Sequence, residues 1–306
     1  MPMQHSPSSY NRQRSAASHL ILFAAAAALT ACATIEEPVG AMRKETVYAV
    51  TSSNQLISFN AGQPQKLLSR KPLNGLQNGE TITGIDYRVV KGWLYALGSS
   101  VRLYRITPSS GAVQMIGSGP IAVSLTGTEF GVDFNPTVDR IRIVSNSGQN
   151  LRVHPDTGAV VDGDPNTPGV QLDGNLAYSG TDPNAGKKPA AVAAAYTYNK
   201  QDEKITTNFA IDAAQGMLVT QGTREGKGPA ISPNTGQLLS VGPLGIGAFE
   251  RASFDIADIS GAAFTAITRS GEKSSSWYEI DLDSGKASMI GKIDSGEPVV
   301  GIAIEP

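Results

Sequence analysis

A strand motif that repeats along the chain, with one copy moved to the opposite end, limits the fold more than any other feature. Short apolar triplets begin at Tyr48, Tyr95 and Arg142, so the first two intervals are both 47 residues. Related triplets follow at residues 209–211 and 265–267. Another short strand precedes every triplet except the first, and the missing copy stands at residues 301–304. The end of the chain therefore supplies the strand that its beginning lacks.

This arrangement is typical of a β-propeller, in which the last strand completes the first blade. Units of 40 to 50 residues with four strands each also indicate propeller blades. We predict an all-β fold of five four-stranded blades, closed by the C-terminal strand. The predicted blades are residues 299–304 with 46–70, then 82–117, 128–161, 191–242 and 252–293. A sixth, degenerate blade in the irregular stretches and a pair of β-sandwiches are the alternatives.

The clearest blade lies at residues 128–161. Phe130, Val132 and Phe134 alternate with polar or small residues, which is the period of a strand with two different faces. Residues 140–144 and 151–153 continue the pattern, and residues 159–161 begin a fourth strand. Four such strands cannot bury both faces alone, so the unit needs neighbours of its own kind.

The first 31 residues have the pattern of a secretory leader. Arg12 and Arg14 precede a short apolar run at residues 20–29, which is shorter than the ~20 residues that span a bilayer. The run ends at Leu29-Thr30-Ala31-Cys32, which resembles the lipobox of bacterial lipoproteins. We expect cleavage before Cys32, lipidation of Cys32, a tether over residues 32–45 and a single domain over 46–306 with an insertion at 162–188. Ala33 after the cysteine implies the outer membrane of a Gram-negative cell, with the protein facing the periplasm.

Composition excludes several classes of site and partner. Cys32 is the only cysteine, so an intramolecular disulfide is impossible. His154 is the only histidine beyond the leader, so a site that needs several histidines cannot form. Beyond the leader acids outnumber bases, which gives no electrostatic reason to bind nucleic acid. We expect a monomer without a cofactor.

Two blocks in the third blade carry a resemblance to a known family. Residues 131–142 read GVDFNPTVDRIR, and residues 145–158 read SNSGQNLRVHPDTG. On these blocks the chain resembles the bacterial domain-of-unknown-function family 4394, and the resemblance extends over about residues 46–306. It implies a propeller-like fold and no particular activity, since none is established for the family.

Three aspartates occupy equivalent positions in the first strands of their blades. They are Asp86, Asp133 and Asp255, and the other two blades have Ala195 and Ala303 there. We expect the three carboxylates to line the central channel. Such a ring can hold a cation or separate its pKa values for acid–base work. The alternative is that each carboxylate accepts a hydrogen bond from the backbone of a neighbouring blade.

The third blade also carries the densest polar cluster in the sequence. The candidate binding residues are Glu129, Asp133, Asn135, Arg140, Arg142, Asn150 and Arg152. Paired guanidinium groups suit a carboxylate or phosphate ligand. The alternative is an ion-pair network between blades, in which the arginines bind Glu129, Asp133 and Asp139.

A weaker candidate site lies in the insertion. Asp162, Asp164, Asn166 and Asp173 have a spacing similar to that of a calcium loop, but Thr167 replaces the glycine of the sharp turn. A solvated loop without a metal is the alternative.

These observations favour a cell-envelope lipoprotein whose propeller binds or scaffolds an unknown peptide, glycan or protein. We expect the ligand at the channel mouth or on the loop at residues 162–188. The alternatives are a hydrolase or lyase that acts on an envelope sugar or ester without histidine, and a purely structural envelope protein. The membrane is the one partner that the sequence indicates directly, through the lipid on Cys32.

Overall fold

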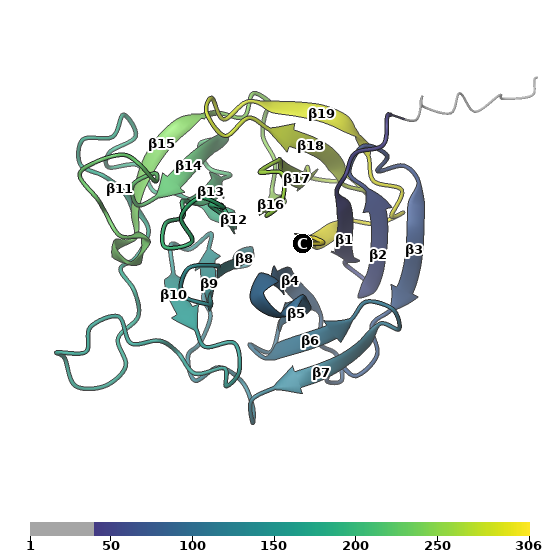
Figure 1. The fold of residues 1–306 in the computed structure, drawn as a ribbon, viewed down its shortest axis with the longest axis horizontal. Helices are drawn as coiled ribbons and strands as arrows, with labels where there is room; N and C mark the ends of the chain where they lie inside the picture. The colour runs from purple at the N-terminus through teal and green to yellow at the C-terminus, as the bar shows by residue number, and fades with distance from the viewer. Residues whose placement is uncertain (1–39) are drawn as a thin grey trace, which may run out of the picture. The chain divides into compact units, whose positions relative to one another are not determined.

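The computed structural model describes residues 40–306, which form a ring of five β-sheets with the C-terminus near the centre (Figure 1). Blade 1 contains β20 (Val299–Ile304), β1 (Thr46–Thr51), β2 (Gln55–Asn60) and β3 (Leu67–Pro72). Blade 2 contains β4 (Ile82–Arg88), β5 (Trp93–Gly98), β6 (Leu103–Thr107) and β7 (Ala112–Ile116). Blade 3 contains β8 (Phe130–Asn135), β9 (Arg140–Ser145) and β10 (Asn150–Val153).

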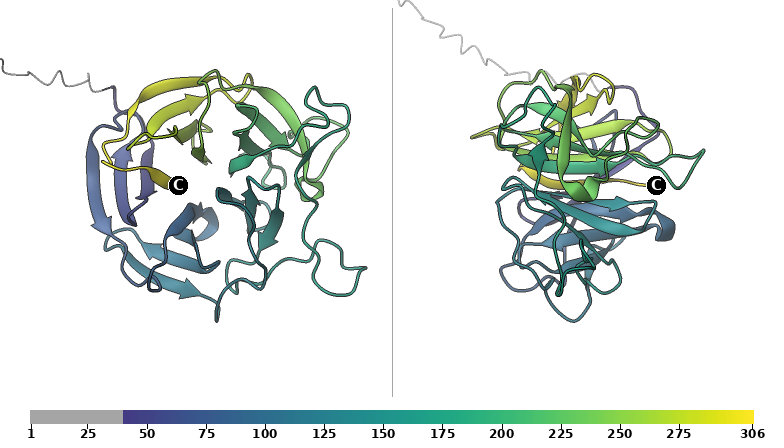
Figure 2. Two further views of the ribbon diagram at one scale, coloured as in Figure 1. Left: turned by 180° about the vertical axis from the view of Figure 1, so that it is seen from behind. Right: turned by 90° about the vertical axis from the view of Figure 1, so that its left-hand side faces the viewer.

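Blade 4 contains β12 (Ala191–Tyr196), β13 (Asn208–Asp212), β14 (Met217–Gln221), β15 (Gln237–Pro243) and the short β11 (Ala177–Tyr178). Blade 5 contains β16 (Arg251–Ile256), β17 (Ala263–Thr268), β18 (Ser276–Ile280) and β19 (Ala287–Lys292). Single turns of 3-10 helix, η1 (Val89–Lys91) and η2 (Pro233–Thr235), lie in connecting loops. The view from behind shows the same closed ring, and the view from the side shows the blades edge-on (Figure 2).

The ring closes as the sequence predicts. Strand β20 pairs antiparallel with β1, and the register places Tyr48 opposite Ala303 and Ala49 opposite Ile302. The head and the tail of the domain therefore share one sheet, and the predicted five-bladed propeller is confirmed.

Small residues let the inner strands β4, β8, β12, β16 and β20 approach closely around the axis. A Cβ atom added to Gly131 would lie 2.5 Å from the backbone nitrogen of Ala194 in the next blade. A Cβ atom added to Gly301 would lie 2.9 Å from the backbone nitrogen of Ile85. Real Cβ atoms do not approach so closely, so glycine at these positions permits the narrow channel.

The hydrophobic core consists of five clusters, one at each interface between neighbouring blades. Inner strands such as β4 and β12 are therefore buried on both faces, whereas outer strands such as β3 alternate between half-buried and exposed residues. Between blades 5 and 1, Trp277 is fully buried and donates a hydrogen bond from Nε1 to the carbonyl of Ala61 at 2.9 Å. This bond satisfies the one polar atom of a large apolar side chain.

Two regions depart from the regular pattern. The strand predicted at residues 159–161 is reduced to a single bridge between Val153 and Val160, so blade 3 has three strands. The insertion at residues 162–188 contains β11, which adds to the outer edge of blade 4 in parallel with β15. The insertion therefore extends an existing blade and does not form a sixth.

Candidate functional site

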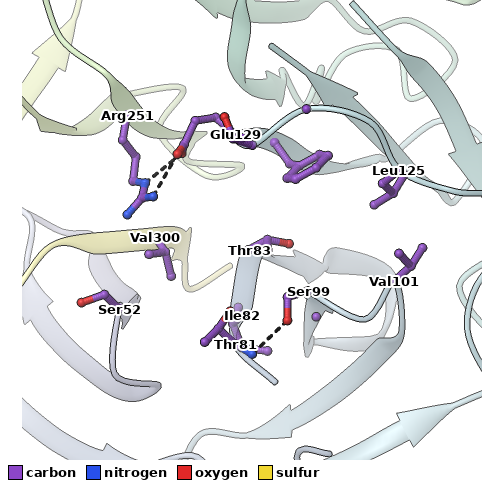
Figure 3. Close-up of a pocket in the computed structure, with 14 residues that line it drawn as sticks. Ser52, Thr81, Ile82, Thr83, Ser99, Val101, Leu125, Glu129, Arg251 and Val300 are labelled. Atoms are coloured by element: carbon purple, nitrogen blue, oxygen red, sulfur yellow. Dashed lines mark hydrogen bonds and ion pairs between the residues drawn. The ribbon is translucent and has the colours of Figure 1, made fainter. Parts of the chain in front are cut away.

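A cavity lies at one mouth of the channel, where four inner strands begin (Figure 3). It has a volume of about 510 Å³. Five hydroxyl side chains contribute to its wall, namely Ser52, Thr81, Thr83, Ser99 and Thr128. Apolar side chains lie between them, namely Ile82, Val101, Leu125, Phe130 and Val300. We call this space the mouth cavity.

One ion pair crosses the wall of the mouth cavity. Arg251 of blade 5 donates two hydrogen bonds to the carboxylate of Glu129, which precedes β8 of blade 3, at 2.8 and 2.9 Å (Figure 3). Blade 4 lies between these two blades in the ring, so the pair joins blades that are not neighbours. Both side chains are partly exposed, at 33% for Arg251 and 18% for Glu129, so the pair keeps access to solvent.

The channel narrows below the mouth. Small residues of the five inner strands surround a cavity of about 10 Å³, which is the volume of one water-sized particle. These residues are Gly84, Gly131, Ala193, Ser253 and Gly301. Ser253 is the only one of the five with a polar side chain, and its buried Oγ has no hydrogen-bond partner.

Further along the same strands, Asp86, Asp133 and Asp255 meet at the axis. One carboxylate oxygen from each lies within 4.8 Å of the others, and the three side chains are almost completely buried. We call these three residues the acid hub. The structure thus brings together the three aspartates that the repeat predicts to line the channel.

Each carboxylate of the acid hub binds the backbone of the next blade. Asp86 accepts a hydrogen bond from the amide of Phe134 at 2.6 Å, and Asp133 accepts one from Tyr196 at 2.8 Å. Asp255 accepts one from Ile304 at 2.6 Å and a second from its own neighbour Ile256. These bonds fix the register of adjacent blades, as expected in the alternative to a ligand site.

The acid hub has unusual electrostatics. Burial raises the pKa of Asp86 to about 8, and it raises the pKa values of Asp133 and Asp255 well above the ordinary value of 3.8. Repulsion from neighbouring carboxylates acts in the same direction, whereas the backbone hydrogen bonds oppose it. Asp258 lies at the outer end of this part of the channel, and burial raises its pKa to about 6.

The predicted arginine cluster is placed away from the channel axis, between blades 3 and 4. Arg142 is 1% exposed, and its Nη1 donates to Asp173 at 2.8 Å and to Asn150 at 2.6 Å. Arg152 makes two hydrogen bonds of 2.8 Å to the same Asp173 carboxylate, whose side chain is fully buried. Asn234 accepts a further bond from Arg142. We call this group the arginine cluster.

The arginine cluster is an ion-pair network between blades, but its acid is not one of those predicted. Asp173 comes from the insertion, whereas Glu129 pairs with Arg251 and Asp139 pairs with Arg88. Asn135 and Arg140 do not join the cluster: Asn135 accepts bonds from Thr137 in its own turn, and Arg140 donates to nearby carbonyls.

The four calcium candidates of the insertion do not converge on one point. Asp162 accepts bonds from the amides of Asp164 and Gln171, and Asp164 accepts bonds from Asn166 and Thr167. Asp173 faces the two arginines. The turn therefore satisfies its carboxylates with its own backbone and side chains.

Besides the hydroxyl residues of the mouth cavity, the sequence patterns do not single out Arg251, Ser253 or Asp258 as site residues. Each lies in or just after β16, and the repeat aligns Ser253 with Gly84, Gly131 and Gly301. Comparison of the repeats offers one signal, because Ser253 stands where three other repeats have glycine. The partner of Arg251 is 122 residues away, and no local pattern indicates it.

Cys32 and the leader lie outside the described residues. Within residues 40–306, no helix has the length and apolar character needed to cross a membrane. The final part of the predicted tether lies on the domain, where Arg43 pairs with Glu279 and its amide donates to Asn60.

Comparison with solved structures gives matches of low identity. TolB from Acinetobacter baumannii matches with 10% identity and a TM-score of 0.42, over 81% of this chain and 53% of that one. A protein of unknown function from Bacteroides thetaiotaomicron matches with 16% identity and a TM-score of 0.45, over 81% of this chain and 58% of that one. The chain thus spans little more than half the length of these structures.

No curated protein matches the chain in sequence. A family model does match, over residues 55–303, which is most of the chain and contains the inner strands, the acid hub and the arginine cluster. Its description is "Domain of unknown function (DUF4394)". The chain belongs to this family of domains of unknown function.

Proposed function

We propose that this protein is a cell-envelope lipoprotein whose propeller binds a small, hydroxyl-rich ligand, such as a saccharide unit of the envelope, in the mouth cavity. The observation that carries the proposal is the mouth cavity itself, with its five hydroxyl side chains beside a partly exposed ion pair. Its volume of about 510 Å³ lies within the ordinary range of small-molecule sites.

The lining suits a ligand with many hydroxyl groups. Serine and threonine hydroxyls both donate and accept hydrogen bonds, Arg251 donates, and Glu129 accepts. Phe130 and the apolar residues beside it offer a surface for the C–H face of a sugar ring. The mouth cavity therefore combines orienting polar groups with apolar area, as binding sites usually do.

The same lining favours binding over hydrolysis. Glycosidases generally use two carboxyl groups on either side of the scissile bond. Among residues 40–306, Glu129 is the only carboxylate that lines the mouth cavity, and Arg251 holds both of its oxygens. No histidine of this part of the chain lines the cavity, so its hydroxyl groups have no imidazole beside them to act as a general base.

The envelope location rests on the leader and on Cys32, the only cysteine in the sequence. A lipid on Cys32 would anchor the protein, because each buried CH₂ of an acyl chain contributes about 0.8 kcal/mol. Labelling with a radioactive or clickable fatty acid tests this part. The label should be incorporated into the membrane-bound wild type and absent from Cys32→Ser, and a labelled or membrane-bound variant would contradict it.

Calorimetric titration with a panel of envelope-derived oligosaccharides and peptides tests the binding site. We expect a saccharide to bind, and Arg251→Ala to weaken it about tenfold or more, because a charged hydrogen bond contributes about 1.5–3 kcal/mol. Arg224→Ala is the matched control, since Arg224 lines a separate cavity of about 500 Å³ on blade 4 and pairs with Asp283. Equal losses in both variants, or binding of peptides alone, would contradict the proposal.

A further inference from the structure

The acid hub gathers three carboxylates in a small volume without a positive side chain to balance them. Asp86, Asp133 and Asp255 are 6%, 4% and 6% exposed, and one oxygen of each lies within 4.8 Å of the others. Within residues 40–306, none of the three takes part in an ion pair with lysine, arginine or histidine. Buried charges in proteins are normally paired or coordinate a metal, and buried carboxyl groups without a partner take up protons, so the acid hub must hold either protons or a bound cation.

Ser253 is an independent sign that the channel takes a ligand at this depth. The residue is 7% exposed, and its Oγ has no hydrogen-bond partner. Ser253 precedes Asp255 by two residues in β16, so both side chains leave the same face of the strand. Ser253 lines the narrow cavity of about 10 Å³ in the channel, and Asp255 lines the next cavity along the same strand. A buried hydroxyl without a partner costs free energy unless something binds it.

We propose that the acid hub binds one calcium-sized cation on the propeller axis, with Asp86, Asp133 and Asp255 as ligands and the Ser253 hydroxyl as a further donor, directly or through one water. Calcium lies about 2.3–2.6 Å from its oxygen ligands, so oxygens on opposite sides are about 4.8 Å apart. The three carboxylate oxygens fall within this span. Magnesium fits less well, because it needs near-octahedral geometry at about 2.0–2.1 Å and usually keeps several waters, and the cavity that the three aspartates line has a volume of only about 10 Å³.

The backbone hydrogen bonds of the hub do not compete with this role. A carboxylate has about four lone-pair sites, so an oxygen that accepts an amide can also bind a cation. The amides of Phe134, Tyr196 and Ile304 instead hold the three carboxylates in position before the cation arrives. Asp258 gives a path of entry, since this partly buried carboxylate lines the outer end of the same channel.

The experiment is calcium titration of the full chain after treatment with EDTA, followed by calorimetry and by thermal melting. We expect one calcium per chain, a rise in melting temperature with CaCl₂, and a smaller rise with MgCl₂. Asp133→Asn should abolish the response while it keeps the bond to Tyr196, because the amide oxygen still accepts. Ser253→Ala should weaken calcium binding about tenfold and leave the fold intact, since blade 4 has alanine at the equivalent position 193.

Asp164→Asn is the control for the insertion and should leave calcium binding unchanged, because Asp164 is satisfied within its own turn. The inference is overturned if the EDTA-treated wild type takes up no calcium and melts at the same temperature with or without it. It is also overturned if Asp164→Asn, and not Asp133→Asn, removes binding. Neither result depends on the saccharide site, which is tested separately at Arg251.

Discussion

The acid hub and the arginine cluster are both buried groups of charges next to the same strand β8, yet they pose opposite electrostatic problems. In the arginine cluster, Asp173 faces Arg142 and Arg152 at 2.8 Å, so each charge has an opposite partner inside the protein. In the acid hub, three carboxylates face one another. The charges of the arginine cluster are therefore paired within the protein, whereas those of the acid hub are neutralised only by protons or a bound cation.

This difference distinguishes buried charges that stabilise the fold from buried charges that bind a ligand. A buried ion pair with all its hydrogen bonds fixes neighbouring elements, although it contributes little net stability compared with an apolar core. A set of buried like charges without an opposite charge beside them destabilises the folded state, so a binding role is the simplest reason for it to persist. The contrast predicts that removing one negative charge has opposite consequences in the two groups.

The largest effect is expected at Asp173. Asp173→Asn leaves Arg142, which is 1% exposed, without its counter-charge, and breaking a buried pair in this way costs about 3–5 kcal/mol. The free energy of unfolding from urea titration measures the loss. A loss below about 1 kcal/mol would show that the arginine cluster is not the structural group described above.

At the acid hub, Asp133→Asn should not destabilise the protein in EDTA. The substitution removes repulsion from Asp86 and Asp255 and keeps an acceptor for Tyr196, so we expect equal or greater stability. It should also abolish the gain with calcium, which is about 2.7 kcal/mol when the concentration is 100 times the dissociation constant. Urea titrations in EDTA and in CaCl₂ give both quantities, and a large loss in EDTA would assign the hub a structural role alone.

The ion pair at the mouth should matter more for binding than for stability. Arg251 and Glu129 are partly exposed, so Arg251→Ala should lower the free energy of unfolding by only about 0.5–1 kcal/mol. Thermal melting beside the saccharide titration checks this prediction. A loss of several kcal/mol in the free energy of unfolding would show that this pair is structural, like the arginine cluster.

The smallest effect on stability is expected at Arg43, where the chain enters the domain. Arg43 lowers the pKa of Glu279 through a hydrogen bond and its charge, so the pair stabilises the fold above the ordinary pKa of 4.5. The stabilisation is lost as the pH falls through the lower pKa of the folded state. Both side chains are about one-third exposed, so Arg43→Ala should cost only a few tenths of a kcal/mol at pH 7 and nothing near pH 2. An equal loss at both pH values would contradict this explanation.

Repetition explains how much of the structure is predictable from sequence. The positions of Asp86, Asp133 and Asp255 in equivalent strands place them on the axis once the ring is recognised, and the strand at residues 301–304 indicates closure. The partner of Arg142 is not predictable in this way. Asp173 belongs to a turn-rich insertion without periodicity, so its path back to blade 3 depends on tertiary packing.

The channel mouth is expected as a binding place, but apart from Glu129 its lining residues are not predicted, for a related reason. Its five hydroxyl side chains come from four loops and strand ends, and each alone has the pattern of an ordinary turn or strand residue. Only the closed ring brings Arg251 of blade 5 to Glu129 near blade 3. Predictions from sequence therefore succeed where the repeat specifies a position, and fail where a site depends on loops or on the insertion, which the repeat does not specify.

The most direct test of the uncompensated acid hub is a crystal structure from calcium-containing solution, with anomalous data collected at a long wavelength. The account predicts one anomalous peak on the propeller axis, about 2.3–2.6 Å from oxygens of Asp86, Asp133 and Asp255. An axis that contains only water, with the three carboxyl groups hydrogen-bonded to one another, would contradict it.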